Sequence, residues 1–311
     1  MNSRFDPAVP GTARARGFVD RRMFLAGAGA LSLVLATGCG GKDKAGDDDA
    51  PTGDRVLGAA FANGLSEDAV LIPGIEQRAP LVIFDVDSGR PLRDNPPDSI
   101  DVELWYKGAL LTKSTLKVHD EEISTPYYPM LMTLPEAGDY EIRAAFSDIP
   151  VGFRASARDK VPLVQVGSPV VSVETPTTTN AMSVTPICTR TPTQCPLHTV
   201  SYAKVLETKG PTALLISTPG FCQTAVCGPV LELLVSEQAN FPKMRMVHAE
   251  VYKDPQQFAA GKPNPETTGA VHAYGLSYEP SLIVANADGI VVSRLDFTWD
   301  RAELRAALQR A

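Results

Sequence analysis

The chain has few cysteines, few histidines and no excess of basic residues for its length. Its 311 residues include five Cys and four His, and 29 Lys and Arg stand against 36 Asp and Glu, for a net charge of −7. Five cysteines are too few for a disulfide-dense scaffold of this length. Binding to nucleic acid needs clustered Lys and Arg to neutralise phosphates, so the acidic balance argues against a nucleic-acid partner.

A long apolar run is also missing near the N-terminus. The apolar stretch at residues 23–37 is shorter than the roughly 20 residues that a membrane-spanning helix needs. It follows an arginine pair, and residues 1–38 contain five Arg and two acidic residues. A basic segment, a short apolar core and small residues are typical of an export signal. We therefore predict that residues 1–38 are a signal peptide.

Two short motifs refine this prediction. Arg-Arg-x-Phe-Leu at residues 21–25 resembles the twin-arginine (Tat) signal, although Asp20 replaces Ser or Thr and Ala26 replaces the common Lys. Ala-Thr-Gly-Cys at residues 36–39 resembles a bacterial lipobox, which implies that Cys39 becomes the mature N-terminus and carries a lipid. These resemblances imply an extracytoplasmic lipoprotein at the cell membrane. A Sec signal and cleavage without lipidation are the alternatives.

The next segment is too polar to fold. Residues 39–54 contain almost no apolar side chain, so they cannot bury enough surface to offset the loss of chain entropy. As a flexible coil they would span roughly 20 Å. We predict that this segment is a disordered tether between the lipid on Cys39 and the folded protein.

Residues 55–173 are rich in short β patterns separated by turn residues. Apolar or alternating runs occur at residues 55–61, 81–86, 100–106, 110–118, 140–146 and 163–173. Evenly spaced short strands with Gly and Pro turns are typical of a β-sandwich. We predict an all-β domain of immunoglobulin-like type, with similarity limited to the architecture because this segment has no cysteine pair.

After a Pro/Thr-rich linker at residues 174–180, residues 181–311 alternate between helix and strand patterns. The expected helices are residues 201–207, 223–236 and 300–309, and the expected strands are residues 212–217, 244–252, 280–286 and 290–297. Asp300 and Glu303 form a capping box at the start of the last helix. This order predicts an α/β layer that ends in an antiparallel hairpin and a helix.

The C-terminal segment resembles the thioredoxin fold. Cys222 ends a strand at its junction with a helix, Pro280 begins the later hairpin, and Asp-Gly-Ile-Val-Val follows at residues 288–292. The resemblance covers residues 181–311 and implies that Pro280 forms a cis peptide beside the redox site. It also implies that Cys222 is the nucleophile and Cys227 the resolving cysteine, with Cys222 activated by the helix N-terminus.

The cysteine spacing departs from that family. Four residues separate Cys222 from Cys227, where thioredoxins have two. On a regular helix these side chains would be about 140° apart and ~7.5 Å apart along the axis. A disulfide therefore requires that Cys222 lie in the loop before the helix, or that the first turn be distorted. Glu279, next to Pro280, is either a proton carrier or a solvated surface acid.

A second pair, Cys188 and Cys195, is separated by six polar, turn-forming residues. In an oxidising compartment this spacing favours a local structural disulfide. The alternatives are a second redox pair that relays electrons to Cys222 and Cys227, cross-pairing between the two sets, and metal binding.

The metal alternative comes from a further resemblance. Copper chaperones of the Sco type share the thioredoxin fold and use two cysteines with a distant histidine. The corresponding set here would be Cys222 and Cys227 with His272, although His198 and His248 are also candidates.

Three functions therefore remain open. The leading hypothesis is a thiol–disulfide oxidoreductase, without a cofactor, acting on envelope proteins that carry cysteines or disulfides. The alternatives are a non-catalytic binding module with structural disulfides, and a Sco-like copper chaperone.

Overall fold

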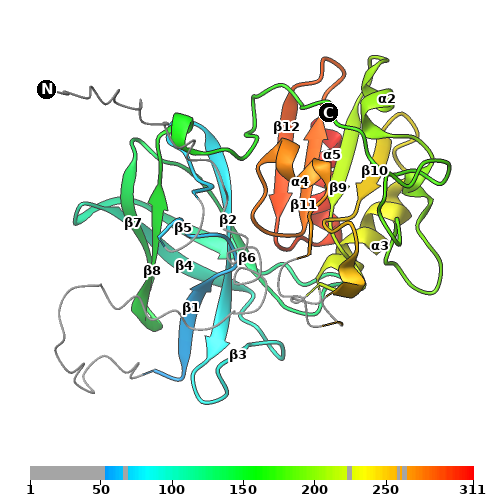
Figure 1. Cartoon of the computed structure of the whole chain (residues 1–311). Helices are drawn as coiled ribbons and strands as arrows, with labels where there is room; N and C mark the ends of the chain where they lie inside the picture. The colour runs from blue at the N-terminus through cyan, green and yellow to red at the C-terminus, as the bar shows by residue number, and fades with distance from the viewer. Residues whose placement is uncertain (1–52, 66–68, 223–225, 258–259, 261–264) are drawn as a thin grey trace, which may run out of the picture.

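The computed structural model describes residues 53–311 except residues 66–68, 223–225, 258–259 and 261–264. The predicted signal peptide, Cys39 and nearly all of the predicted tether lie outside the described residues. The described part of the chain is mostly β-sheet with a few short helices (Figure 1). None of the helices in these ranges is both long and apolar enough to cross a membrane.

The N-terminal region contains two antiparallel four-stranded sheets. One consists of β1 (Arg55–Ala59), β2 (Glu76–Asp85), β3 (Arg90–Pro91) and β6 (Tyr128–Thr133); the other has the order β5 (Ala109–Lys117), β4 (Ser99–Tyr106), β7 (Gly138–Ala144) and β8 (Ser147–Ala155). Alternate residues of β4, such as Val102 and Leu104, are buried together with Leu81 and Ile83 of β2 in one hydrophobic core. The prediction of an all-β N-terminal domain is therefore confirmed.

Three strands of this domain were absent from the sequence prediction. All three contain proline, Pro91 in β3, Pro129 in β6 and Pro150 in β8. Proline cannot donate a hydrogen bond to a neighbouring strand, so a proline within a sequence is normally taken to interrupt a strand. In the structure β8 is the last strand of its sheet, and β6 pairs with β2 alone. Edge positions of this kind accept proline because one side of the strand needs no partner.

The C-terminal region is built on a sheet with the order β10-β9-β11-β12. In chain order the elements are α2 (Tyr202–Leu206), β9 (Thr212–Ile216), α3 (Cys227–Glu237), β10 (Arg245–Ala249), α4 (Gly269–Tyr274), β11 (Ser281–Ala285), β12 (Val291–Asp296) and α5 (Arg301–Gln309). β9 is parallel to β10 and antiparallel to β11, which pairs with β12 in an antiparallel hairpin. Every residue of β9 and of β11 is buried, as their continuous apolar runs predict.

Helices cover both faces of this sheet. Leu215 of β9 shares a hydrophobic cluster with Leu231 of α3 and Leu304 of α5. Leu214 and Ile216, which point to the opposite face, belong to the core that includes residues of α2 and α4. That core is continuous with the core of the N-terminal domain.

The local signals for α5 and α3 had different outcomes. At α5, Asp300 caps the helix, with its side chain accepting a hydrogen bond from the Glu303 N–H at 2.8 Å, which is one half of the predicted capping box. The other half is not formed, because the Asp300 N–H donates to the Tyr127 hydroxyl. By contrast α3 begins at Cys227 and not at residue 223. The helix N-terminus therefore lies at Cys227 and not at Cys222.

The connection between the two regions is packed against the C-terminal sheet. The predicted strand at residues 163–173 is not a regular strand, but Gly167 N–H donates to the carbonyl of Val291 at 2.8 Å and Val170 N–H donates to that of Gly289 at 2.9 Å. In the Pro/Thr-rich segment, Thr175 is 1% exposed. Residues 163–180, which we call the connecting strap, are therefore packed against the protein and do not form a free linker.

A buried polar network joins the two regions at the start of α5. Arg78 of β2 donates to Glu303 Oε1 at 2.5 Å and Oε2 at 2.7 Å, and also to the carbonyl oxygens of Asp296 and Thr298. Tyr127 donates its hydroxyl hydrogen to Glu303 Oε2 at 2.5 Å. Because the side chains of Arg78 and Glu303 are only 7% and 14% exposed, these charges depend on one another for compensation.

Candidate functional site

Cys222 and Cys227 form a disulfide at the carboxyl end of β9. Their Cα atoms are 5.9 Å apart. Cys222 lies in the loop before α3 and is partly exposed, whereas Cys227 is the first residue of α3 and is completely buried. This is the arrangement that the wide cysteine spacing requires for closure. Cys222 is therefore the more exposed residue of the pair.

Glu279 lies behind this disulfide. Its side chain is buried, which excludes a solvated surface acid, and its Oε2 is 3.7 Å from Cys227 Sγ. The backbone N–H of Thr218, at the end of β9, donates to the same oxygen at 2.5 Å. Burial raises the pKa of Glu279 to about 8, because the charged form loses its hydration. The peptide bond between Glu279 and Pro280 is cis, as the sequence resemblance implies.

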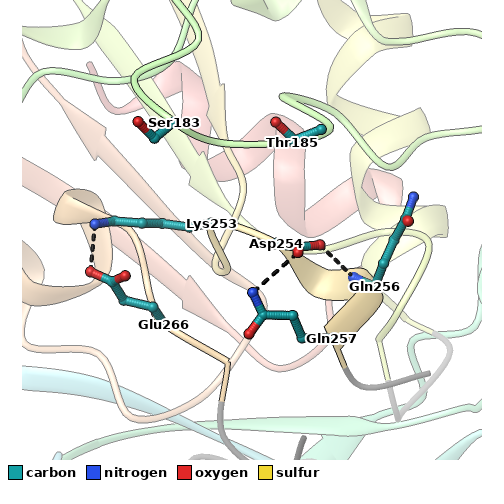
Figure 2. Close-up of a pocket in the computed structure, with 7 residues that line it drawn as sticks. All are labelled: Ser183, Thr185, Lys253, Asp254, Gln256, Gln257 and Glu266. Carbon is teal, nitrogen blue, oxygen red and sulfur yellow. Dashed lines mark hydrogen bonds and ion pairs between the residues drawn. The ribbon is translucent and has the colours of Figure 1, made fainter. Parts of the chain in front are cut away.

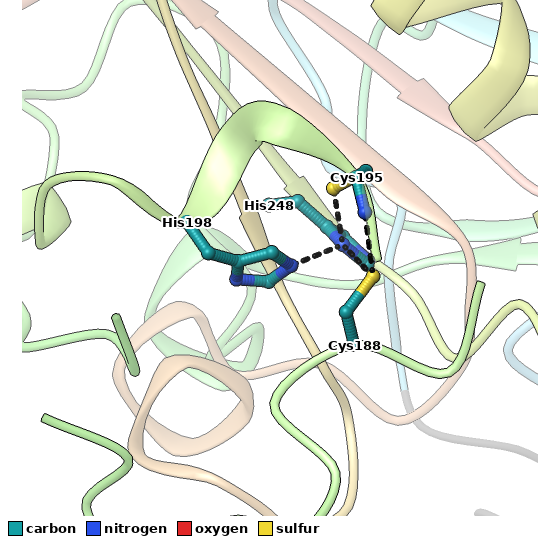
Figure 3. A group of neighbouring side chains, drawn as sticks. All are labelled: Cys188, Cys195, His198 and His248. Carbon is teal, nitrogen blue, oxygen red and sulfur yellow. Dashed lines mark hydrogen bonds between the residues drawn. The ribbon is translucent and has the colours of Figure 1, made fainter. Parts of the chain in front are cut away.

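The second cysteine pair does not form the predicted disulfide. Cys188 and Cys195 are both buried and unbonded, and His248 of β10 lies against them, with its Nδ1 3.5 Å from Cys195 Sγ and 3.9 Å from Cys188 Sγ (Figure 3). His198 completes the group, with its Nε2 3.1 Å from His248 Nδ1. The sequence prediction treated the loop in isolation and missed the histidine that the neighbouring strand brings between the sulfurs.

The two thiols of this cluster have opposite pKa shifts. Close contact between the two thiols lowers the pKa of Cys188 and raises that of Cys195, which favours a thiolate at Cys188 and a thiol at Cys195. Burial lowers the pKa of His248, which favours its neutral form. Neutral imidazole and thiolate are both metal-ligating species.

A hydrogen bond joins the two chain segments that carry the two cysteine pairs. Thr189, next to Cys188, accepts a hydrogen bond at its Oγ1 from the backbone N–H of Gly220, at 2.9 Å. A Cβ atom at Gly220 would lie 2.7 Å from the Thr189 carbonyl oxygen, so only glycine fits this approach. Thr189 also donates to the buried carboxyl of Glu250, through its backbone N–H at 2.6 Å. Burial raises the pKa of Glu250 to about 8.

The metal set suggested by the copper-chaperone resemblance is not assembled. His272 lies on α4 and its Nε2 is 3.0 Å from the hydroxyl of Thr267. Among the described residues, the groups that could together hold a metal ion are Cys188, Cys195, His198 and His248, and a second group at the domain interface, His119, Asp300 and Glu303. The structure therefore places histidines 198 and 248 against the other cysteine pair.

A polar cavity of about 440 Å³ lies elsewhere in the C-terminal region (Figure 2). Its lining residues are Ser183, Thr185, Lys253, Asp254, Gln256, Gln257 and Glu266. Lys253 pairs with Glu266 across it at 2.5 Å. The lining contains no cysteine or histidine, and we assign it no part in the redox chemistry.

Comparisons with known proteins identify no family. No protein-family model matches the chain, and no curated protein does so. The solved structures that match include the Escherichia coli adhesin FdeC, at 16% identity and a TM-score of 0.21 over 40% of this chain and 37% of that one. A complex of titin with an obscurin-like 1 immunoglobulin domain matches at 16% identity and a TM-score of 0.18, over 34% of this chain and 91% of that one. At these TM-scores the likenesses carry no inference about function.

Proposed function

We propose that the chain is a membrane-anchored, extracytoplasmic thiol–disulfide oxidoreductase with a thioredoxin-like C-terminal domain. The observation that carries the proposal is a disulfide between the partly exposed Cys222 and the fully buried Cys227, whose Sγ is 3.7 Å from the carboxyl of Glu279. A purely structural staple would not need a buried carboxyl with a raised pKa beside one of its sulfurs.

The topology of the C-terminal region supports the thioredoxin-like assignment. A parallel pair, β9 and β10, is followed by an antiparallel hairpin, β11 and β12, with helices on both faces. The disulfide lies after the first strand of this unit, and the cis Pro280 precedes the hairpin. The sequence resemblance implies both of these positions, but it places the helix N-terminus at Cys222, whereas α3 begins at Cys227.

The geometry supports a specific order of bond changes. A substrate thiolate attacks Cys222 Sγ, the bond to Cys227 breaks, and Cys227 leaves as a thiolate that accepts a proton from Glu279. The substrate is then joined to Cys222 in a mixed disulfide. A second substrate thiolate attacks the substrate sulfur of that bond and releases Cys222. The substrate dithiol has lost two electrons, and the cysteine pair has gained them.

In the reverse direction the same groups reduce a substrate disulfide. Cys222 attacks as the thiolate, and Cys227 gives its proton to Glu279 before it resolves the mixed disulfide. The electrons reside in the cysteine pair, so the exchange needs no further cofactor. We propose that a lipid on Cys39 holds the protein at the membrane surface, where its substrates are envelope proteins that carry cysteines or disulfides.

Trapping of mixed disulfides tests this proposal. In the Cys227→Ser variant the resolving thiol is absent, so we expect covalent adducts between Cys222 and envelope proteins, released by reductant and visible on non-reducing gels. The matched control is Cys222→Ser, which leaves only the buried Cys227 and should trap few or none.

If neither variant forms adducts while both remain folded, the oxidoreductase proposal fails. That outcome would favour the alternative, a binding module in which this disulfide is structural.

A further inference from the structure

The four buried side chains of the cluster that includes His248 come from three separate elements. Cys188 lies in the loop after the connecting strap, Cys195 immediately precedes the short 3₁₀ helix Pro196–His198, and His248 lies in β10. Their ligating atoms all lie within 4.8 Å of one another, and all four residues are buried (Figure 3). The disulfide at Cys222 uses none of them.

Hydrogen bonds alone satisfy this cluster only in part. The Nε2 of His248 lies 3.1 Å from the carbonyl oxygen of Ser217, which can only accept, so Nε2 carries the proton. The Nδ1 of neutral His248 then has a single lone pair. Three groups compete for that lone pair, namely His198 Nε2 and the sulfurs of Cys195 and Cys188.

The three distances from His248 Nδ1 to the other ligating atoms are close to those of a tetrahedral metal site with two sulfur and two nitrogen ligands. With Zn–S near 2.3 Å and Zn–N near 2.05 Å, tetrahedral geometry separates the two nitrogens by ~3.3 Å and each sulfur from each nitrogen by ~3.6 Å. The nitrogens of His198 and His248 are 3.1 Å apart. His248 Nδ1 is 3.5 Å from Cys195 Sγ and 3.9 Å from Cys188 Sγ.

The surrounding hydrogen bonds favour the ligating forms of His248 and Cys188. The Ser217 carbonyl orients His248 so that Nδ1 faces the sulfurs. The backbone N–H of Cys195 donates to Cys188 Sγ at 3.3 Å, a contact that stabilises a thiolate. All four ligands come from the protein and all are buried, so the site is closed, as structural zinc sites are.

We propose that Cys188, Cys195, His198 and His248 bind one Zn²⁺ ion as a structural site. The ion would tie the loop at residues 188–198 to β10. Through Thr189, which meets the N–H of Gly220, it would also fix the segment that leads to Cys222. The donor set is two thiolates and two imidazoles, which suits zinc in a tetrahedral arrangement. This proposal does not depend on the redox activity of Cys222 and Cys227.

Metal titration of the full chain tests the proposal. The protein is stripped with a chelator under reducing conditions, supplied with Zn²⁺ alone, freed of excess metal and analysed for zinc content. We expect one zinc ion per chain. Supplied with Co²⁺ instead, the protein should show the thiolate charge-transfer and strong visible bands of a tetrahedral sulfur-ligated ion.

Variants locate the site. Cys195→Ser and His198→Ala should lose more affinity for Zn²⁺ than the ~100-fold that loss of an outer-shell partner costs. His198→Cys replaces one zinc ligand by another and should still bind one ion, with a stronger charge-transfer band for Co²⁺. The matched controls are His272→Ala and the double variant Cys222→Ser/Cys227→Ser, which should both keep the full zinc content.

Three results would overturn the proposal. One is a folded wild-type chain that retains no zinc. Another is unchanged zinc binding in Cys195→Ser and His198→Ala, and the third is tight binding of Cu⁺ with no binding of Zn²⁺. Because the double variant lacks the redox disulfide, loss of exchange activity there with zinc retained would separate the two proposals.

Discussion

On the proposed exchange mechanism, replacing Glu279 with glutamine should slow the oxidation of a substrate dithiol by the Cys222–Cys227 disulfide by about 100-fold, the usual contribution of a positioned proton donor. The reason is that the attack on Cys222 releases Cys227 as the leaving group. Cys227 is fully buried, and a thiolate formed there without a proton donor would be costly. Glutamine keeps an oxygen that can accept from the Thr218 N–H but has no proton to give. Stopped-flow kinetics with a model dithiol peptide measures the effect.

The pH dependence gives this prediction a second, independent readout. With a pKa of about 8, Glu279 is protonated below that pH and loses its proton above it. The wild-type rate, corrected for the ionisation of the attacking thiol, should therefore fall as the pH rises through about 8. Glu279→Gln should lack that fall. If the rate of the variant falls above pH 8 in the same way as the wild-type rate, another group supplies the proton.

The same substitution should also raise the free energy of unfolding, by an amount that depends on pH. A carboxyl whose pKa rises on folding binds its proton more tightly in the folded state, so folding weakens as the pH rises from the unfolded pKa near 4.5 to about 8. A glutamine side chain does not ionise, so its burial brings no such loss of stability as the pH rises. Glu279→Gln should therefore gain stability relative to wild type between pH 5 and pH 8. The control Glu207→Gln, an exposed acid at the end of α2, should change neither the rate nor this pH dependence.

Replacing Arg78 with methionine destabilises the protein by about 3–5 kcal/mol, the usual cost of leaving one partner of a buried ion pair alone. Arg78 donates to both carboxylate oxygens of Glu303 and to two backbone carbonyls of the C-terminal region. Methionine fills similar space but leaves those oxygens without their donor. Urea unfolding, followed by fluorescence and circular dichroism, measures the loss.

Two further variants separate this interface effect from a general one. Adding Glu303→Gln to Arg78→Met removes the uncompensated charge and should recover part of the lost stability, because the two residues are coupled. Arg154→Met removes an exposed ion pair with Asp139 and should cost about 1 kcal/mol or less. Equal losses in Arg78→Met and Arg154→Met would contradict a buried interdomain network.

The sequence predicted the elements whose signals are local. The buried runs of β9 and β11 and the cap of α5 are each specified by adjacent residues, and the structure has all of them. The cysteine spacing left two ways for the disulfide to close, a distorted first turn or Cys222 in the loop before the helix, and the structure has the second. The start of α3 was missed, since the helical pattern does not reveal how much chain the disulfide loop takes up.

The His248 cluster could not be found in this way. His248 is 53 residues from Cys195 along the chain, and only the packing of the 3₁₀ helix Pro196–His198 against β10 brings it to the sulfurs. A partial signal was present in Cys195-Pro-Leu-His198, a short spacing that places a sulfur and an imidazole on one turn. The burial of Glu279 was equally hidden, because the residues that cover it belong to other elements.

A redox titration of the full chain tests the central claim most directly. The protein is equilibrated with glutathione or dithiothreitol buffers of graded potential, and the fraction of Cys222–Cys227 disulfide is read by thiol alkylation and mass spectrometry. An exchange enzyme requires a midpoint potential between about −120 and −270 mV, the range of thiol–disulfide oxidoreductases, and we predict a value in that range. A disulfide that stays oxidised below about −300 mV would be a structural staple and would contradict the account.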